Sequence, residues 1–119
     1  MNKKGKIVIG ISIGDINGIG IEVILKTFED KRMLDFCTPL LFGSSKVIAA
    51  HKKTLNIETH IHEIKSIQQI KEGQINLLTV WDEEVKLDIG NATKIGGQYA
   101  FKSLNEATKA LKKGEIDLL

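Results

Sequence analysis

The sequence has little cysteine and no long apolar run, and each shortage excludes a class of protein. Cys37 is the single cysteine among the 119 residues, so an internal disulfide is excluded. A lone cysteine agrees with a reducing compartment, so we expect a cytoplasmic protein with a buried, unreactive Cys37 thiol. No apolar stretch approaches the roughly 18 residues that a membrane-spanning helix needs, so we expect no membrane contact.

The first residues imitate a signal peptide without completing the pattern. The segment "MNKKGKIVIGISIGD" places basic residues before apolar ones, as a secretory signal does. Gly10 and Gly14 interrupt the apolar run, Asp15 ends it, and no small-residue cleavage site follows. We therefore expect residues 6–13 to form the first strand of the fold.

Charge of one sign is also scarce. The chain has 17 lysines and arginines against 15 aspartates and glutamates, which gives a formal net charge of +2. The basic residues are scattered, and pairs such as Lys52-Lys53 and Lys112-Lys113 suit solvated helix ends. The sequence therefore predicts no nucleic-acid partner, and its length allows one domain with a buried core.

Short apolar runs alternate with helical patterns along the chain. Runs of this kind predict buried strands when they are rich in isoleucine, valine and leucine. The predicted strands lie at 6–13, 39–43, 59–64 and 75–81, and a further strand begins within 115–119.

Two longer helices and one shorter helix are predicted between these strands. The first has apolar residues at i, i+3, i+4 and i+7, which form one face of a helix: Ile21, Ile24, Leu25 and Phe28. The last has a similar face, and Gly114 after it suits a left-handed stop: Ala100, Leu104, Ala107 and Leu111. The short helix is expected to begin at a cap supplied by Ser44 or Ser45 and to run to about His51.

Alternation of strands and helices indicates an α/β fold with a largely parallel sheet and flanking helices. We find no internal repeat, low-complexity tract or linker in the sequence. Because a strand pattern is only beginning at 115–119, we expect residues 1–119 to be a single partial domain of a larger protein.

The segment "IGISIGDINGIGIEVILKTF", residues 9–28, is the most glycine-rich part of the chain. A P-loop is excluded, because Gly20 is followed by Ile21 and Glu22 instead of lysine and a hydroxyl residue. The dinucleotide fingerprint Gly-x-Gly-x-x-Gly is also incomplete, because Val23 occupies the position of its third glycine.

Local chemistry leaves two interpretations of this segment open. In one, main-chain amides from Gly20 onward face an anionic ligand, although Glu22 would repel a phosphate, and Asp15 caps the turn or binds a ribose or an amine. In the other, the glycines only permit a sharp reversal at positive φ.

Two blocks of the sequence resemble one enzyme family. Residues 14–22, "GDINGIGIE", resemble the Gly-Asp-x-x-Gly-Ile-Gly-x-Glu signature that opens the 4-hydroxythreonine-4-phosphate dehydrogenases. Residues 90–119 are similar to a later segment of that family, which ends with Gly-Glu-Ile-Asp before a strand. The wider isocitrate and isopropylmalate dehydrogenase superfamily carries a shorter version with proline at the position of Ile21, and the fold is expected to resemble its N-terminal part.

The resemblance implies an NAD-dependent and metal-dependent dehydrogenase of pyridoxal phosphate biosynthesis. Its members oxidise 4-hydroxythreonine 4-phosphate to a β-keto acid, which loses carbon dioxide to give 3-amino-2-oxopropyl phosphate. A divalent metal polarises the reacting oxygen, and the active site lies at a homodimer interface.

The resemblance assigns cofactor-binding positions but no catalytic or metal-binding residue within 1–119. The Gly-Ile-Gly turn borders the NAD site, which maps to Gly18, Ile19 and Gly20, with Ile19 as an apolar wall. Asp15 and Asn17 are neighbouring polar candidates. The family's metal-binding histidines and substrate clamp come later than residue 119, so we expect the chain alone to be inactive.

The three histidines suggest weaker sites of their own. His60 and His62 would share one face of a strand and form a possible metal pair, although Glu58 and Glu63 beside them suit a solvated edge strand equally well. His51, near a predicted helix end, suits a favourable charge at the C-terminus of that helix.

Two alternatives to the main interpretation stay open. In the first, the chain belongs to a sister dehydrogenase that acts on threonate or erythronate phosphate. This alternative stays open because the substrate-selecting residues lie outside the chain. In the other alternative, it is a non-catalytic module that only folds or associates.

Overall fold

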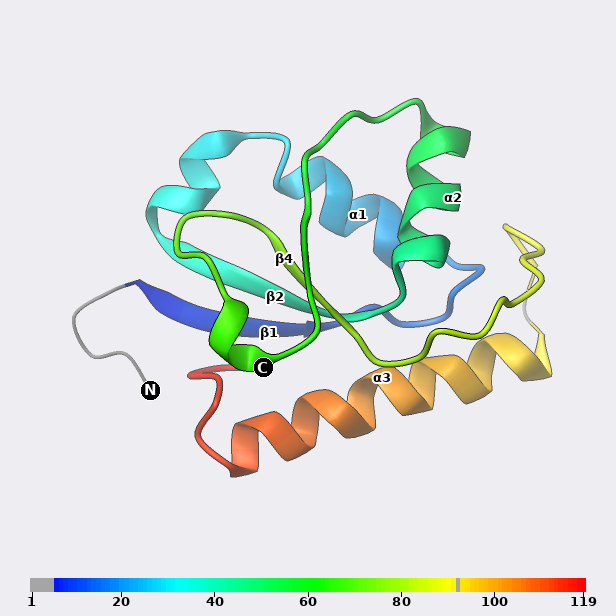
Figure 1. The fold of residues 1–119 in the computed structure, drawn as a ribbon. Helices are drawn as coiled ribbons and strands as arrows, with labels where there is room; N and C mark the ends of the chain where they lie inside the picture. Colours follow the sequence, from blue (N-terminus) through cyan, green and yellow to red (C-terminus); the bar gives the residue numbers. More distant parts are fainter. Residues whose placement is uncertain (1–5, 92) are drawn as a thin grey trace.

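The structure is a computed structural model that describes residues 6–91 and 93–119. A four-stranded sheet forms its centre, with helices packed on both faces (Figure 1). The elements in chain order are β1 (Ile7–Ser12), α1 (Gly20–Thr27), η1 (Lys31–Asp35), β2 (Cys37–Gly43), α2 (Ser45–Leu55), β3 (His62–Ile64), η2 (Ile67–Gln69), β4 (Asn76–Thr79) and α3 (Lys94–Lys112).

The strands follow the order β1-β2-β4-β3, and every strand pair in the described part of the chain is parallel. Leu40 lies at the centre of the register, opposite Gly10 of β1 and Asn76 of β4. Leu118 forms one further parallel bridge, with Ile9 of β1. The Leu118 carbonyl accepts a 2.8 Å hydrogen bond from the Gly10 amide. The strand expected to begin within 115–119 is thus present as a single bridge.

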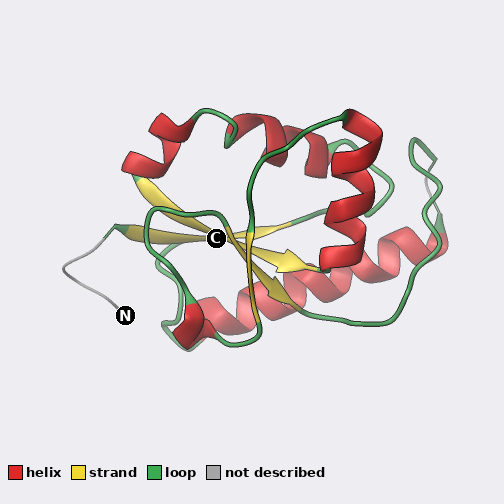
Figure 2. Cartoon of the chain, turned by 45° about the horizontal axis from the view of Figure 1, so that its top comes forward, coloured by secondary structure: helices red, strands yellow, loops and turns green. Residues whose placement is uncertain are grey.

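Helices α1 and α2 cover one face of the sheet, and α3 crosses the other face (Figures 1 and 2). Alternation along β2 supplies both layers of the core, because successive side chains point to opposite faces. Leu41 packs in the cluster under α1 and α2, whereas Leu40 and Phe42 pack with Ala107 of α3. Since every residue of β2 is buried, the central strand has the continuous apolar pattern of a parallel sheet.

Strands and helices form in the regions that the sequence predicts, but their bounds differ. The strand expected at 39–43 begins earlier, at Cys37, and the last helix begins at Lys94, before its predicted apolar face. The strands expected at 59–64 and 75–81 are shorter in the structure, at His62–Ile64 and Asn76–Thr79. Two short 3-10 helices, η1 and η2, were not predicted. Asp30 accepts a 3.0 Å bond from the Arg32 amide to begin η1, and a Ser66–Gln69 capping box begins η2.

The helix ends confirm one predicted cap and contradict another. Ser44 occupies the N-cap position of α2, but its side chain forms no capping hydrogen bond within the described residues, so the predicted role of its hydroxyl is wrong. Helix α2 continues past His51 to Leu55, and Asn56 ends it with φ of 56°. Gly114, with φ of 74°, provides the predicted left-handed stop after α3.

Helix α3 is anchored to the carboxyl ends of two strands by a buried serine. Ser103 Oγ accepts a 3.1 Å hydrogen bond from the Ile13 amide after β1 and donates a 2.5 Å bond to the Phe42 carbonyl in β2. This pair of bonds fixes the exit of β1 against α3. Within the described part of the chain, no helix is both long and apolar enough to cross a membrane.

Candidate functional site

The glycine-rich loop leaves β1 at the carboxyl edge of the sheet and leads into α1. Among its described glycines only Gly14 has a positive φ, of 70°. Gly20 makes a close approach instead: a Cβ there would lie 3.1 Å from the Ile13 carbonyl oxygen, which is tighter than an ordinary contact. The interpretation that the glycines permit a reversal at positive φ therefore applies to Gly14 and not to Gly18 or Gly20.

Asp15 shapes the turn of this loop. Its Oδ1 accepts a 2.8 Å hydrogen bond from the Asn17 amide, and its carbonyl accepts a 2.9 Å bond from the Gly18 amide. Gly96, in the first turn of α3, lies against the same carboxylate, and a Cβ at that position would overlap Asp15 Oδ1. The loop and the start of α3 therefore fit closely only because residue 96 is glycine.

Asn17 joins the loop to a segment more than seventy residues later in the chain. Its Oδ1 accepts a 2.7 Å bond from the Asp88 amide, and its carbonyl accepts a 2.8 Å bond from the Gly90 amide. Its Nδ2 donates a 3.1 Å bond to Oγ1 of Thr93, the residue that caps α3. Because both ends of the amide are engaged and Asn17 is 2% exposed, its side chain holds the loop.

His51 supports the loop from α2, which corrects the predicted role of this residue. It is 2% exposed and does not lie at the end of the helix. Its Nε2 lies 2.6 Å from the Ile16 carbonyl oxygen. A carbonyl only accepts hydrogen bonds, so we assign the proton to Nε2. Sequence reasoning missed this contact because it links residues 35 positions apart.

The loop forms one wall of a cavity of about 240 Å³. Its apolar lining comes from Ile19, Leu55 and Ile89, and Ile19 is 76% exposed. Asp15 and Glu22 supply acidic groups, and none of the described residues that line the cavity is lysine or arginine. The chemistry therefore suits a neutral or cationic ring better than a phosphate. The predicted residues Asp15, Asn17, Gly18 and Ile19 all line this cavity, whereas Gly20 does not.

A larger cavity of about 680 Å³ lies at the amino edge of the sheet, where the strands begin. Charges of both signs line it, including Lys31, Asp35 and Glu58. Ligands of open parallel α/β sheets bind outside the carboxyl ends of the strands. The position in the fold thus favours the smaller cavity beside the glycine-rich loop.

The predicted histidine pair is not arranged on one strand. β3 begins at His62, so His60 lies before the strand, and His62 Nε2 lies 3.3 Å from the Gln69 carbonyl oxygen. Residues 6–91 and 93–119 contain no group of three histidine, cysteine, aspartate or glutamate side chains that could hold a metal ion. Cys37 is buried as predicted, and burial raises the pKa of its thiol.

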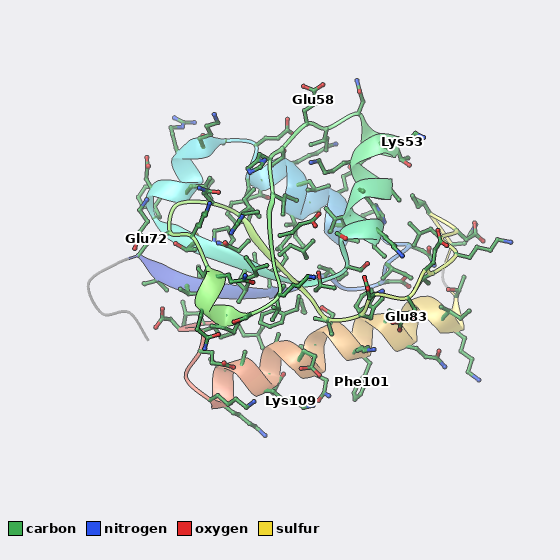
Figure 3. The ribbon with its side chains drawn as sticks, in the orientation of Figure 1. Lys53, Glu58, Glu72, Glu83, Phe101 and Lys109 are labelled. Atoms are coloured by element: carbon green, nitrogen blue, oxygen red, sulfur yellow. The ribbon has the colours of Figure 1, made fainter. Side chains whose placement is uncertain are left out.

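A polar cluster beside the N-terminal half of α3 was missed by sequence reasoning. Tyr99 packs against Trp81 with ring centroids 4.6 Å apart and ring planes tilted by 49°, and its hydroxyl donates a 3.0 Å bond to Glu83. Figure 3 shows Glu83 beside α3, where Lys102 Nζ lies 3.7 Å from its carboxylate. Burial and the Glu83 bond raise the pKa of Tyr99. The Glu83 main-chain amide and the Tyr99 hydroxyl lower the pKa of Glu83.

Comparison with known proteins connects this geometry to one family. The family model described as "Pyridoxal phosphate biosynthetic protein PdxA" matches residues 35–119. A 4-hydroxythreonine-4-phosphate dehydrogenase from Bacteroides thetaiotaomicron is 37% identical over 117 residues, which cover 98% of this chain and 32% of the relative. A putative D-threonate 4-phosphate dehydrogenase from Clostridium botulinum is 32% identical, over 96% of this chain and 35% of the relative.

Solved structures agree with these relatives. The crystal structure of a 4-hydroxythreonine-4-phosphate dehydrogenase from Burkholderia phymatum superposes with a TM-score of 0.82 at 26% identity, over 95% of this chain and 35% of that one. A putative enzyme of the same name from Salmonella typhimurium shares the fold, with a TM-score of 0.73 at 18% identity. The chain spans about a third of the length of the curated relatives that it matches.

Proposed function

The chain belongs to the family of pyridoxal phosphate biosynthetic proteins PdxA, and from this premise we propose that it is the N-terminal, cofactor-binding part of an NAD-dependent dehydrogenase. The observation that carries the proposal is the cavity at the carboxyl edge. Four of the five residues expected to border the cofactor line this one cavity: Asp15, Asn17, Gly18 and Ile19.

The side chains of this chain would hold one ring of the cofactor. Ile19, Leu55 and Ile89 offer apolar surface to a planar ring, and Asp15 and Glu22 add negative charge near it. This charge favours the nicotinamide ring, which is cationic in its oxidised form, over the pyrophosphate. Bound NAD would supply the acceptor for the hydride.

The proposed substrate is 4-hydroxythreonine 4-phosphate, and the oxidised product would lose carbon dioxide to give 3-amino-2-oxopropyl phosphate. The similarity to the Bacteroides thetaiotaomicron enzyme supports this choice. Because the chain spans about a third of the length of its relatives, we expect the ligands of a divalent metal in the rest of the complete protein, beyond residue 119. We therefore expect the purified 119-residue chain to form no NADH from this substrate, with or without added metal. Homodimer formation and a cytoplasmic location are further predictions for the complete enzyme.

Two other functions have specific observations in their favour. The Clostridium botulinum relative supports a dehydrogenase of D-threonate 4-phosphate, which a comparison of kcat/KM for both substrates in the complete enzyme would distinguish. Exposed apolar side chains on α3 support an association module, and Phe101, which is 69% exposed, projects away from the sheet (Figure 3). Light scattering of the chain would detect such association.

The test of the proposal is a substitution in the apolar wall. Ile19→Asn should weaken NAD⁺ binding to the chain about tenfold or more, because it replaces the apolar wall with a neutral amide that the bound cofactor would desolvate. Phe36→Asn is the matched control, since Phe36 is also 76% exposed but lies next to the start of β2 at the opposite edge. Calorimetric titration should give an unchanged dissociation constant for the control. Equal affinity in both variants would contradict the proposal.

A further inference from the structure

We propose that His51 is a positioning residue for the loop of residues 14–20, which it holds through a hydrogen bond to the Ile16 carbonyl. The role in holding the loop depends only on the geometry. Its effect on cofactor binding rests on the proposed function.

The bond is buried and connects two elements. His51 lies in α2, is 2% exposed, and places Nε2 2.6 Å from the Ile16 oxygen. Ile16 is 0% exposed, so the residue that supplies the acceptor is enclosed as well. Water therefore has little access to replace the imidazole as the hydrogen-bond donor.

His51 completes an anchor that involves two consecutive loop residues. Ile16 is held by α2 through His51, and Asn17 is held by the segment that precedes α3 through Asp88 and Thr93. The next residue, Gly18, and then Ile19 line the cavity that His51 also lines. Fixing the peptide between Ile16 and Asn17 therefore sets the position of the apolar wall.

Two substitutions separate the hydrogen bond from the packing. His51→Leu fills a similar volume but removes the donor, which leaves the Ile16 carbonyl buried without a partner. His51→Gln retains an N–H that can reach a carbonyl acceptor. If His51 only filled space, leucine would replace it at least as well as glutamine. Wild-type behaviour in His51→Gln but not in His51→Leu would therefore show that the hydrogen bond is what matters.

Amide hydrogen exchange of the ¹⁵N-labelled chain measures the effect on the loop. The reporter is the Gly18 amide, which donates to the Asp15 carbonyl, and the reference is Leu77 in β4. We expect Gly18 to exchange about tenfold faster in His51→Leu and within about threefold of wild type in His51→Gln, with Leu77 unchanged. Identical Gly18 rates in the two variants would overturn the proposal.

The wild-type chain provides a second measurement that does not depend on the variants folding. The imidazole proton should be found on Nε2 of His51 and should exchange slowly with solvent, and a proton on Nδ1 alone would overturn the proposal. Titration with NAD⁺ then separates the two claims. Weaker binding in His51→Leu with rescue in His51→Gln supports both. Absence of NAD⁺ binding in wild type, with the exchange pattern intact, would refute the cofactor function and leave the role of His51 supported.

Discussion

The two edges of the parallel sheet carry cavities of opposite character. The cavity at the amino edge is the larger, at about 680 Å³ against about 240 Å³ at the carboxyl edge. The amino-edge cavity is lined by side chains of both charges, and exposed residues such as Lys31 and His60 contribute to it. The carboxyl-edge cavity is bounded by a loop that His51 and Asn17 hold in place.

The hydrogen bonds that fix the walls of a cavity are a better guide to its function than its volume. At the carboxyl edge, the buried side chains of His51 and Asn17 are hydrogen-bonded to the Ile16 carbonyl and to Asp88 and Thr93. Buried hydrogen bonds of this kind restrict a loop to one conformation, because breaking any of them leaves a polar group without a partner. A preorganised loop is what a cofactor site needs.

The largest effect is expected from removing the cross-link at the carboxyl edge. Asn17→Ala would remove the acceptor of the Asp88 amide and the donor to Thr93, so the free energy of unfolding should fall by about 2–3 kcal/mol. Asn105→Ala is the control, because Asn105 is exposed on α3, away from this cross-link, and its effect should stay within about 0.5 kcal/mol. Urea unfolding of both variants measures the difference. Equal stabilities would show that the carboxyl edge is no more tightly built than the surface.

A second test uses two neighbouring glycines in the first turn of α3. Gly96→Ala should destabilise the fold by about 1–3 kcal/mol, because its Cβ would overlap the Asp15 carboxylate. A Cβ at Gly97 would meet no described atom within 4 Å, so Gly97→Ala should stabilise the helix by up to about 1 kcal/mol. Thermal unfolding should move the two midpoints in opposite directions. A loss of stability in both variants would mean that the Asp15 contact is not the cause.

A smaller effect is expected at the cluster that follows β4. Tyr99 is the single tyrosine of the chain, so the absorbance of its phenolate reports its pKa directly. Glu83→Gln should lower that pKa toward the ordinary value of tyrosine. The pKa should stay above that ordinary value, because burial is the larger cause of the shift. Because the folded-state pKa is raised, this group stabilises the fold below its unfolded pKa, and the contribution is lost as pH rises through the folded pKa. An unchanged titration curve in the variant would exclude the Glu83 bond as a cause.

The smallest effect is expected at the amino edge. His60 is exposed and lies before β3. His60→Ala should therefore change the free energy of unfolding by no more than about 0.5 kcal/mol and leave the affinity for NAD⁺ unchanged. The two measurements are urea unfolding and calorimetric titration. A marked loss of NAD⁺ affinity in this variant would reverse the comparison between the two edges.

The fold could be predicted from the sequence largely because its periodicities are strong. The apolar run in β2 and the apolar spacing in α1 reflect burial, which the sequence records directly. Asp88 and Thr93 could not be placed against the loop from the sequence, because their contacts with Asn17 depend on how α3 crosses the sheet.

Part of the site left a signal that was available but misinterpreted. Gly96 lies inside a helical pattern, where glycine is unfavourable, and such a residue usually has a packing reason. His51 was interpreted as a charge at a helix end because the predicted helix stopped there, four residues before Leu55. With the helix extended, the same residue is internal and faces the loop. Hydrogen bonds between distant segments remain invisible to periodicity.

The central claim is that the carboxyl edge, and not the larger cavity, binds the cofactor. The most direct measurement is a titration of the ¹⁵N-labelled chain with NAD⁺, followed by the chemical shifts of its main-chain amides. We expect the shifts to concentrate at residues 14–20 and 89–91, which surround the cavity beside Ile19. Shifts concentrated instead at residues 28–35, 58–60 and 73–75, around the amino-edge cavity, would contradict it.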